Sequence, residues 1–260
     1  MAETERQSAV PQLDLLAALA QVDSDTTGAE TFERYIWQAK QAVRQWLTCL
    51  SGHGGPVFLV CEQVEDLTLV YRDRIRFLQL KTRDRGSWSA LAMCDRGIGA
   101  LVRSYTAARN AGLHELATFE LWLEGPTSDV AETVAFASGP AGAGKAVRTK
   151  ITSLGLKRAW LDDFLQRLVI RPDQPTRAHI DAKALWELSA LWPALSRPEL
   201  DLVYERLLNA ATAAQGAAAA PATVQAHLAA ARLHIGHHLP GPDEPGGACI
   251  RRARTTYSVR

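Results

Sequence analysis

The stretch that decides the fold reads VFLVCEQVEDLTLVYRDRIRFLQLKT and covers residues 57–82. Three apolar runs within it, at residues 57–61, 67–70 and 75–80, have the length and composition of β-strands. The polar segment 71–74 separates the second run from the third and predicts a tight turn. The sequence therefore predicts three strands, of which the last two form an antiparallel hairpin.

The register of this hairpin decides which side chains meet at its open end. If Val70 lies opposite Ile75, then Asp66 falls opposite Gln79, and both side chains point to the same side of the sheet. Lys81 shares that side because side chains alternate along a strand with a period of two. A carboxylate, an amide oxygen and an ammonium group are therefore expected to gather at one end of the hairpin.

Two further expectations follow from the same alternation. If the strand before Asp66 continues straight, the carboxylate of Glu62 joins the group. The opposite face of the hairpin is expected to be apolar and to consist of Leu67, Leu69, Leu78 and Leu80.

The gathered side chains are suited to the hydrolysis of a phosphodiester. Asp66, Gln79 and Glu62 offer the hard oxygen ligands that Mg²⁺ prefers, and Mn²⁺ is an alternative. Such a cation polarises a phosphoryl oxygen and lowers the pKa of a bound water, while Lys81 can position that water or stabilise charge on the phosphate. The competing interpretation is a solvated strand end with a surface ion pair between Asp66 and Lys81.

The rest of the chain predicts an α/β fold followed by helices. An amphipathic helix is expected before the strands, ending near residue 50, and another at residues 91–111. A strand is expected at 117–123 and one more at 133–137. From residue 149 onward the strand signals stop, and helices are expected at 159–168, 180–191, 198–214 and 221–235. The predicted parts are an arm (1–21), an α/β domain (22–150), a helical lobe (151–239) and a disordered tail (240–260).

Composition narrows the class of protein. The formal net charge of +1 shows no global basic excess, so any nucleic-acid-binding surface must be local. The cysteines are far apart and lack CxxC spacing, which argues against a zinc ribbon or a disulfide framework. The first residues lack the basic start of a signal peptide, and no apolar run approaches the length of a spanning helix. We expect a cytoplasmic protein without a membrane partner.

Basic residues surround the proposed site in the sequence. The arginines that would contact DNA phosphates are Arg72, Arg74, Arg83 and Arg85. The alternative is a solvated hairpin tip in which acidic neighbours neutralise these arginines.

Residues 139–145, GPAGAGK, fit the GxxxxGK pattern of an ATP-binding loop. Ala146 stands where a working loop has Ser or Thr, which favours a flexible basic loop over a nucleotide site.

An acid, a hairpin and then Gln79-Leu-Lys81 resemble the signature of the PD-(D/E)xK nuclease superfamily, with Glu65-Asp66 at the first acidic position. Together with the helix GAETFERYIWQ at residues 28–38, the pattern is most similar to the double-stranded-DNA endonuclease domain of bacterial anti-phage effectors, the Cap-type CBASS endonucleases. The resemblance is firm over residues 25–125 and looser to about residue 215.

The resemblance implies a restriction-endonuclease-like mixed sheet flanked by helices and followed by a helical lobe. It implies that Asp66, Gln79 and Lys81 bind the metal and catalyse. An acid of the opening helix, Glu33 ahead of Glu30, is the additional ligand that it implies. It also implies a defence effector that cuts double-stranded DNA. Because arginine and lysine contacts to phosphates carry no base information, we expect little sequence preference.

The chain departs from the family in two respects. Gln79 replaces the commoner acid, which leaves fewer negative ligands. The family's effectors carry a nucleotide-sensing domain, which these 260 residues do not accommodate, so we expect a separate sensor or ATPase subunit or a shortened relative. The helices after residue 149 are expected to support a homo-oligomer. The alternative function is a catalytically inactive nuclease-like module that binds DNA or a partner protein.

Overall fold

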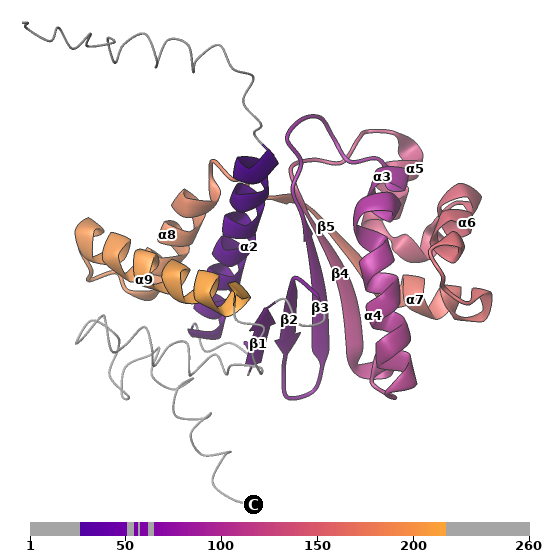
Figure 1. The fold of residues 1–260 in the computed structure, drawn as a ribbon, viewed down its shortest axis with the longest axis horizontal. Helices are drawn as coiled ribbons and strands as arrows, with labels where there is room; N and C mark the ends of the chain where they lie inside the picture. The colour runs from indigo at the N-terminus through magenta and orange to yellow at the C-terminus, as the bar shows by residue number, and fades with distance from the viewer. Residues whose placement is uncertain (1–26, 51–54, 57, 62–64, 217–260) are drawn as a thin grey trace, which may run out of the picture. The chain divides into compact units, whose positions relative to one another are not determined.

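The computed structural model describes residues 27–50, 55–56, 58–61 and 65–216 (Figure 1). The chain divides into two compact units, Met1–Glu33 and Arg34–Arg260. The sheet and the helices that cover it belong to the second unit, apart from the first turns of α2. The expected arm 1–21, the helix 221–235 and the tail 240–260 lie outside the described residues.

A five-stranded mixed sheet, in the order β1-β2-β3-β4-β5, organises the second unit. Its strands are β1 (Phe58–Cys61), β2 (Leu67–Val70), β3 (Ile75–Lys81), β4 (Ala117–Glu124) and β5 (Leu168–Gln174). The first three strands pair antiparallel, whereas β4 lies parallel to both β3 and β5. The expected mixed sheet flanked by helices is confirmed.

One face of the sheet is covered by α2 (Thr27–Leu50), α8 (Ile180–Leu191) and α9 (Arg197–Gly216) (Figure 1). The core on this face joins α2 to the leucines of the hairpin and to apolar residues of both later helices. Its members include Trp37, Val43 and Trp46 of α2, Leu67, Leu69, Leu78 and Leu80 of the hairpin, and Ile180, Leu188 and Val203. The prediction of an apolar hairpin face is confirmed.

The other face is covered by helices that lie between the strands in sequence (Figure 1). They are α3 (Ala90–Met93), the π-helix η1 (Cys94–Ile98), α4 (Gly99–Asn110), α5 (Ala131–Ser138), α6 (Lys145–Ser153) and α7 (Leu161–Arg167). Aromatic rings form much of this core: Tyr105 packs edge-on against Phe119 and Phe164, with ring centroids 5.5 Å and 5.3 Å apart.

Close contact between η1 and β4 requires glycine at one position. A Cβ at Gly97 would overlap the side chain of Leu121, which is fully buried. Gly97 therefore lets the π-helix approach the sheet where a larger residue would hold it away.

Two sequence-based expectations about secondary structure are wrong. Residues 133–137 lie in helix α5 and do not form a strand. Strands do not stop at residue 149, because Leu168–Gln174 forms β5 between the helices expected at 159–168 and 180–191. The sheet thus extends into the segment that was expected to form a helical lobe.

The GxxxxGK segment also lacks the context of an ATP-binding loop. It follows helix α5 instead of a strand, contains the 3-10 turn Pro140–Gly142, and ends at the first residue of α6. A phosphate-binding loop of this type needs a strand before it.

Among the described helices, none combines the length and the apolar character needed to cross a membrane.

Candidate active site

The hairpin brings Asp66, Gln79 and Lys81 together at its open end. Val70 pairs with Ile75 and Leu67 with Leu78, which is the predicted register. The next position outward places Asp66 beside Gln79, whose amide nitrogen donates a hydrogen bond to the Asp66 Oδ2 atom. Lys81 Nζ lies 3.8 Å from the same oxygen. The geometric part of the prediction, a gathering of these three side chains, therefore holds.

Asp66 occupies a partly enclosed position just before β2. Its side chain is 14% exposed, and its Oδ2 atom also accepts the backbone N–H of Leu80 at 2.7 Å. Burial raises the pKa of Asp66 above its usual range, although the charge of Lys81 and hydrogen bonds from Leu80, Gln79 and Gln38 oppose that shift. Lys81 and the hydrogen bonds thus do not fully offset the effect of burial on the ionised carboxylate. A divalent cation beside Asp66 would add positive charge and stabilise its ionised form.

Gln79 is buried and presents its amide nitrogen, not its oxygen, to Asp66. Half a turn about the terminal side-chain bond would exchange the two atoms and bring the oxygen to the side of Asp66. In that orientation one carboxylate and one amide oxygen would face the same point. This donor set fits a hard divalent cation that completes its shell with water or phosphate oxygens.

A second carboxyl group lies next to Asp66. Glu65 is buried and accepts a hydrogen bond from the hydroxyl of Ser104 on α4. Burial raises the pKa of Glu65 to about 7, the Ser104 hydrogen bond opposes this, and the negative charge of Asp66 adds to it. Sequence reasoning placed Glu65 in the acidic motif without a role, because strand alternation assigns Glu65 and Asp66 to opposite faces of the sheet.

The two other predicted metal ligands have different positions. Glu62 lies outside the described residues. Glu33 is exposed on α2 and ends the first compact unit, so its part in the site stays a prediction. Within the described part of the chain, no three His, Cys, Asp or Glu side chains gather as a metal cluster would require.

The four predicted DNA-contacting arginines lie at opposite ends of β3. Arg72 and Arg74 belong to the turn before β3, roughly 20 Å from Lys81 at the strand's rise per residue. Arg83 and Arg85 follow directly after Lys81, and the Arg83 guanidinium lies over the Trp88 ring at 5.2 Å. The structure thus brings only the second pair to the end of the sheet that carries Asp66.

One basic residue beside the site comes from α4. Arg103 is exposed, and its charge acts to lower the pKa of Glu65. It lies one residue before Ser104, the hydrogen-bond donor to Glu65, so helix α4 borders the site with a positive charge.

Comparison with known proteins connects this geometry to a family. Residues 26–116 match the family described as "Cap4, dsDNA endonuclease domain". The segment includes α2, the hairpin with Asp66, Gln79 and Lys81, and helix α4. The predicted resemblance to the Cap-type double-stranded-DNA endonuclease domain is confirmed. A comparison with curated protein sequences finds no match.

Solved structures of two receptors match part of this chain. The Moraxella osloensis Cap4 SAVED/CARF-domain containing receptor matches with a TM-score of 0.47 and 11% identity over 77% of this chain and 47% of that one. The corresponding receptor of Acinetobacter baumannii matches with a TM-score of 0.46 and 12% identity over 76% of this chain and 46% of its own. The chain therefore spans about half the length of the solved structures that it matches.

Proposed function

We propose that this chain hydrolyses phosphodiester bonds of double-stranded DNA with the help of a divalent cation. The observation that carries the proposal is the meeting of Asp66, Gln79 and Lys81 at the hairpin end, inside the segment that matches a double-stranded-DNA endonuclease domain. Asp66 would hold Mg²⁺ or Mn²⁺ together with Gln79, once the Gln79 amide has rotated to present its oxygen. When bound, the cation polarises the phosphate and lowers the pKa of a coordinated water.

Lys81 has a distinct task in this proposal. Its ammonium group lies at 3.8 Å from Asp66, longer than a direct hydrogen bond, so it is free to donate to a phosphate oxygen or to a water. In the reaction one P–O bond forms to the water oxygen and one P–O bond of the backbone breaks. Lys81 stabilises the negative charge that develops on the phosphate as these bonds exchange.

DNA binding is proposed to depend mainly on phosphate contacts. Arg83, Arg85 and Arg103 lie near the site, and Arg72 and Arg74 would reach a duplex that runs along β3. Contacts of this kind carry little sequence information and weaken with salt, because they release bound counterions. We therefore propose little sequence preference.

Control of the enzyme is also part of the proposal. A nuclease with little sequence preference would damage the DNA of its own host, so its activity must be controlled. We propose a defence effector that is active as a homo-oligomer or together with a separate sensor or ATPase subunit. Cleavage assays over a dilution series, together with light scattering, would reveal dependence on assembly. Full specific activity of a strict monomer without partners would contradict this part.

The decisive experiment uses supercoiled plasmid DNA and the purified full chain with Mg²⁺, with and without EDTA. Asp66→Ala should abolish cleavage. Asp73→Ala is the matched control, since Asp73 is a carboxylate of the same hairpin that lies exposed at its far end beside Arg74. Cleavage by folded Asp66→Ala at the wild-type rate would overturn the proposal. Salt-dependent DNA binding without any cutting would favour the inactive module.

A further inference from the structure

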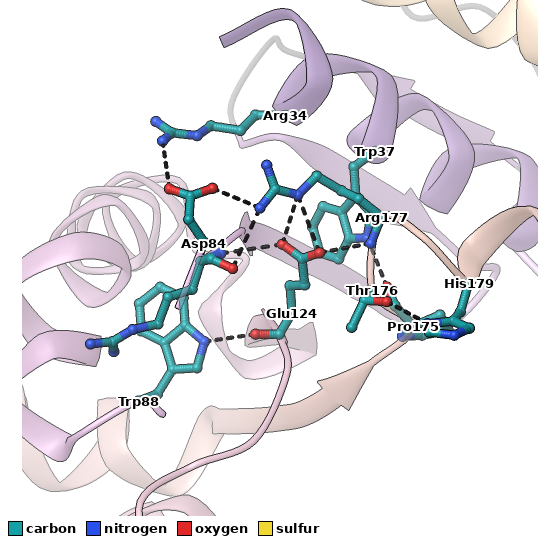
Figure 2. Close-up of polar contacts among 10 residues, drawn as sticks. Arg34, Trp37, Asp84, Trp88, Glu124, Pro175, Thr176, Arg177 and His179 are labelled. Atoms are coloured by element: carbon teal, nitrogen blue, oxygen red, sulfur yellow. Dashed lines mark hydrogen bonds and ion pairs between the residues drawn. The ribbon is translucent and has the colours of Figure 1, made fainter. Parts of the chain in front are cut away.

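A second polar cluster lies where β4 ends, on the face of the sheet covered by α2 (Figure 2). Its centre is the carboxylate of Glu124, the last residue of β4, whose side chain is 5% exposed. We call it the Glu124 cluster, and its members are Glu124, Arg83, Asp84, Trp88 and Arg177. A buried carboxylate is costly unless it is paired and hydrogen-bonded, and Glu124 has partners of both kinds.

Arg177 neutralises Glu124 from the connection between β5 and α8. Its backbone N–H donates to Glu124 Oε1 at 2.7 Å, and its Nε atom lies 3.2 Å from Oε2. Its Nη2 atom reaches Asp84 Oδ1 at 2.7 Å (Figure 2). Arg177 thus joins the end of β4 to the segment that follows β3.

Glu124 also holds the segment after Lys81 directly. The backbone N–H of Arg83 donates to Glu124 Oε2 at 3.2 Å, and the Trp88 indole N–H donates to the Glu124 carbonyl at 2.9 Å. Trp88 is fully buried, and its backbone N–H donates to the carbonyl of Pro126 at 2.9 Å. Both ends of the segment 83–88 are therefore fastened to the end of β4.

Lys81 and Arg83 are two residues apart, so the contacts of Arg83 restrict how the chain leaves β3. Lys81 pairs with Leu123 in the parallel ladder, which places Glu124 one residue beyond the catalytic lysine's own partner. The side chain of Lys81 points to the opposite face from Glu124, because Trp122 and Glu124 share the alternation of the α2 face. Any effect of Glu124 on Lys81 must therefore pass through the backbone.

We infer that Glu124 is a positioning residue for Lys81, acting through the backbone N–H of Arg83 and supported by Arg177. The inference rests on the proposed nuclease function. A shift of the strand exit would move the Lys81 ammonium group relative to Asp66 and the phosphate, and displacements of about 1 Å can lower a rate by about 100-fold.

The test compares Glu124→Gln with Glu120→Gln. Glu120 is a second buried carboxylate on the same strand and face, paired with Arg76 at 2.6 Å, but its ion pair lies away from the segment after Lys81. Both variants lose one buried charge pair. Single-turnover cleavage rates at saturating DNA, and DNA dissociation constants measured in EDTA, are taken well below the melting temperature of each variant.

In Glu124→Gln we expect a cleavage rate lower by about tenfold or more. The DNA affinity of this variant should stay within about twofold of the wild type. Glu120→Gln should show no such loss of rate. Equal rates in the two variants would overturn the inference. A uniform loss of DNA affinity in Glu124→Gln would overturn it as well.

A second measurement separates this inference from the proposed function. Amide hydrogen exchange of Arg83, followed by NMR in DNA-free protein, needs no activity and should be faster by about tenfold in Glu124→Gln but unchanged in Glu120→Gln. Unchanged exchange in Glu124→Gln would show that the charge of Glu124 does not hold the segment. A wild-type protein that cuts no DNA would instead refute the proposed function, and the catalytic part of the inference with it.

Discussion

Gln79 occupies a position of the candidate site where the PD-(D/E)xK nucleases, which this sequence resembles, more often carry an acid. In the structure its amide N–H group satisfies Asp66, so the cation-free site contains one negative charge at this point instead of two. A glutamate would place a second carboxylate against Asp66. Like charges at short distance disfavour the cation-free state and favour a bound divalent cation.

We therefore expect Gln79→Glu to remain active and to need less Mg²⁺, with the half-saturating concentration lower by about tenfold. Its melting temperature in EDTA should fall below that of the wild type, because the two carboxylates repel each other. A magnesium titration of the cleavage rate and thermal melts in EDTA measure both effects. An inactive but folded variant would mean that the amide itself has a role in the reaction.

Glu120 provides a pH-dependent contribution to stability elsewhere in the sheet. Burial alone would raise the pKa of Glu120, but hydrogen bonds and the charge of Arg76 hold it below its ordinary value. Since the folded pKa is depressed, the stabilisation is present above the unfolded pKa near 4.5 and is lost as the pH falls through the folded pKa.

Glu120→Gln should accordingly lower the free energy of unfolding by about 3 kcal/mol at pH 7, since it leaves Arg76 without its charged partner. The difference between variant and wild type should shrink as the pH falls below about 4.5. Urea unfolding at pH 7 and at pH 4, in EDTA, gives both values. A difference that grows on acidification would contradict the assigned role of this pair.

At the scale of elements, the π-helix η1 and strand β4 meet at Gly97. Leu121 leaves no space for a Cβ there, although the glycine's backbone angles are ordinary. Two residues later, a Cβ at Gly99 would meet only Leu154 Cδ2, at 3.7 Å, which is an ordinary contact. Substitution of Gly97 therefore tests a packing requirement, whereas substitution of Gly99 tests helix propensity alone.

Gly97→Ala should lower the free energy of unfolding by about 1–3 kcal/mol through overpacking. Gly99→Ala should leave it unchanged or raise it by about 0.5–1 kcal/mol, because alanine favours a helix interior. Chemical denaturation of the two variants measures the contrast. Equal stabilities would show that the approach of η1 to β4 does not depend on glycine.

The elements also show which parts of the fold can be predicted from sequence. The hairpin register was predictable because its apolar alternation and its four-residue turn agree on one pairing. Strand β5 was missed because it carries Pro172 and Asp173, residues that are depleted in strands and tolerated here at the sheet edge. The run in α5 is too short for its periodicity to separate helix from strand.

The candidate site could be predicted from local sequence, whereas the Glu124 cluster could not. Asp66, Gln79 and Lys81 are close in sequence and joined by one hairpin, so local pairing brings them together. Glu124 and Arg177 are 53 residues apart and meet only because β4 and β5 are neighbours in the sheet. No local pattern in the sequence predicts such a contact.

At the scale of the whole molecule, the layer formed by α2, α8 and α9 belongs to one core and does not form a separate lobe. Helices α8 and α9 contribute five large aliphatic side chains to the core over the hairpin: Ile180, Leu188, Leu200, Val203 and Leu207. At about 2 kcal/mol for each buried side chain, they contribute on the order of 10 kcal/mol. The entropy cost of ordering both helices offsets part of this gain, but a domain is stable by only about 5–15 kcal/mol, so loss of the layer is expected to unfold it.

A chain that ends at residue 175 should therefore fail to fold, whereas one that ends at residue 216 keeps every described residue and should unfold cooperatively. Circular dichroism melts and gel filtration of the two chains provide the measurement. Cooperative unfolding of the shorter chain would show that α8 and α9 are an accessory layer.

The composition of this layer has a consequence for how the protein is made. Trp37 leaves the ribosome early, and its core partner Val203 is added 166 residues later. At translation speeds of about 5–20 residues per second, the wait is on the order of ten seconds. During that time the apolar side of the hairpin on the nascent chain lacks its covering helices, and chaperones can bind it. Asp66, Gln79 and Lys81 have all been synthesised by then, but the hairpin that aligns them is not yet packed. A nuclease with this architecture would gain its activity only after the core residues of α9 have left the ribosome.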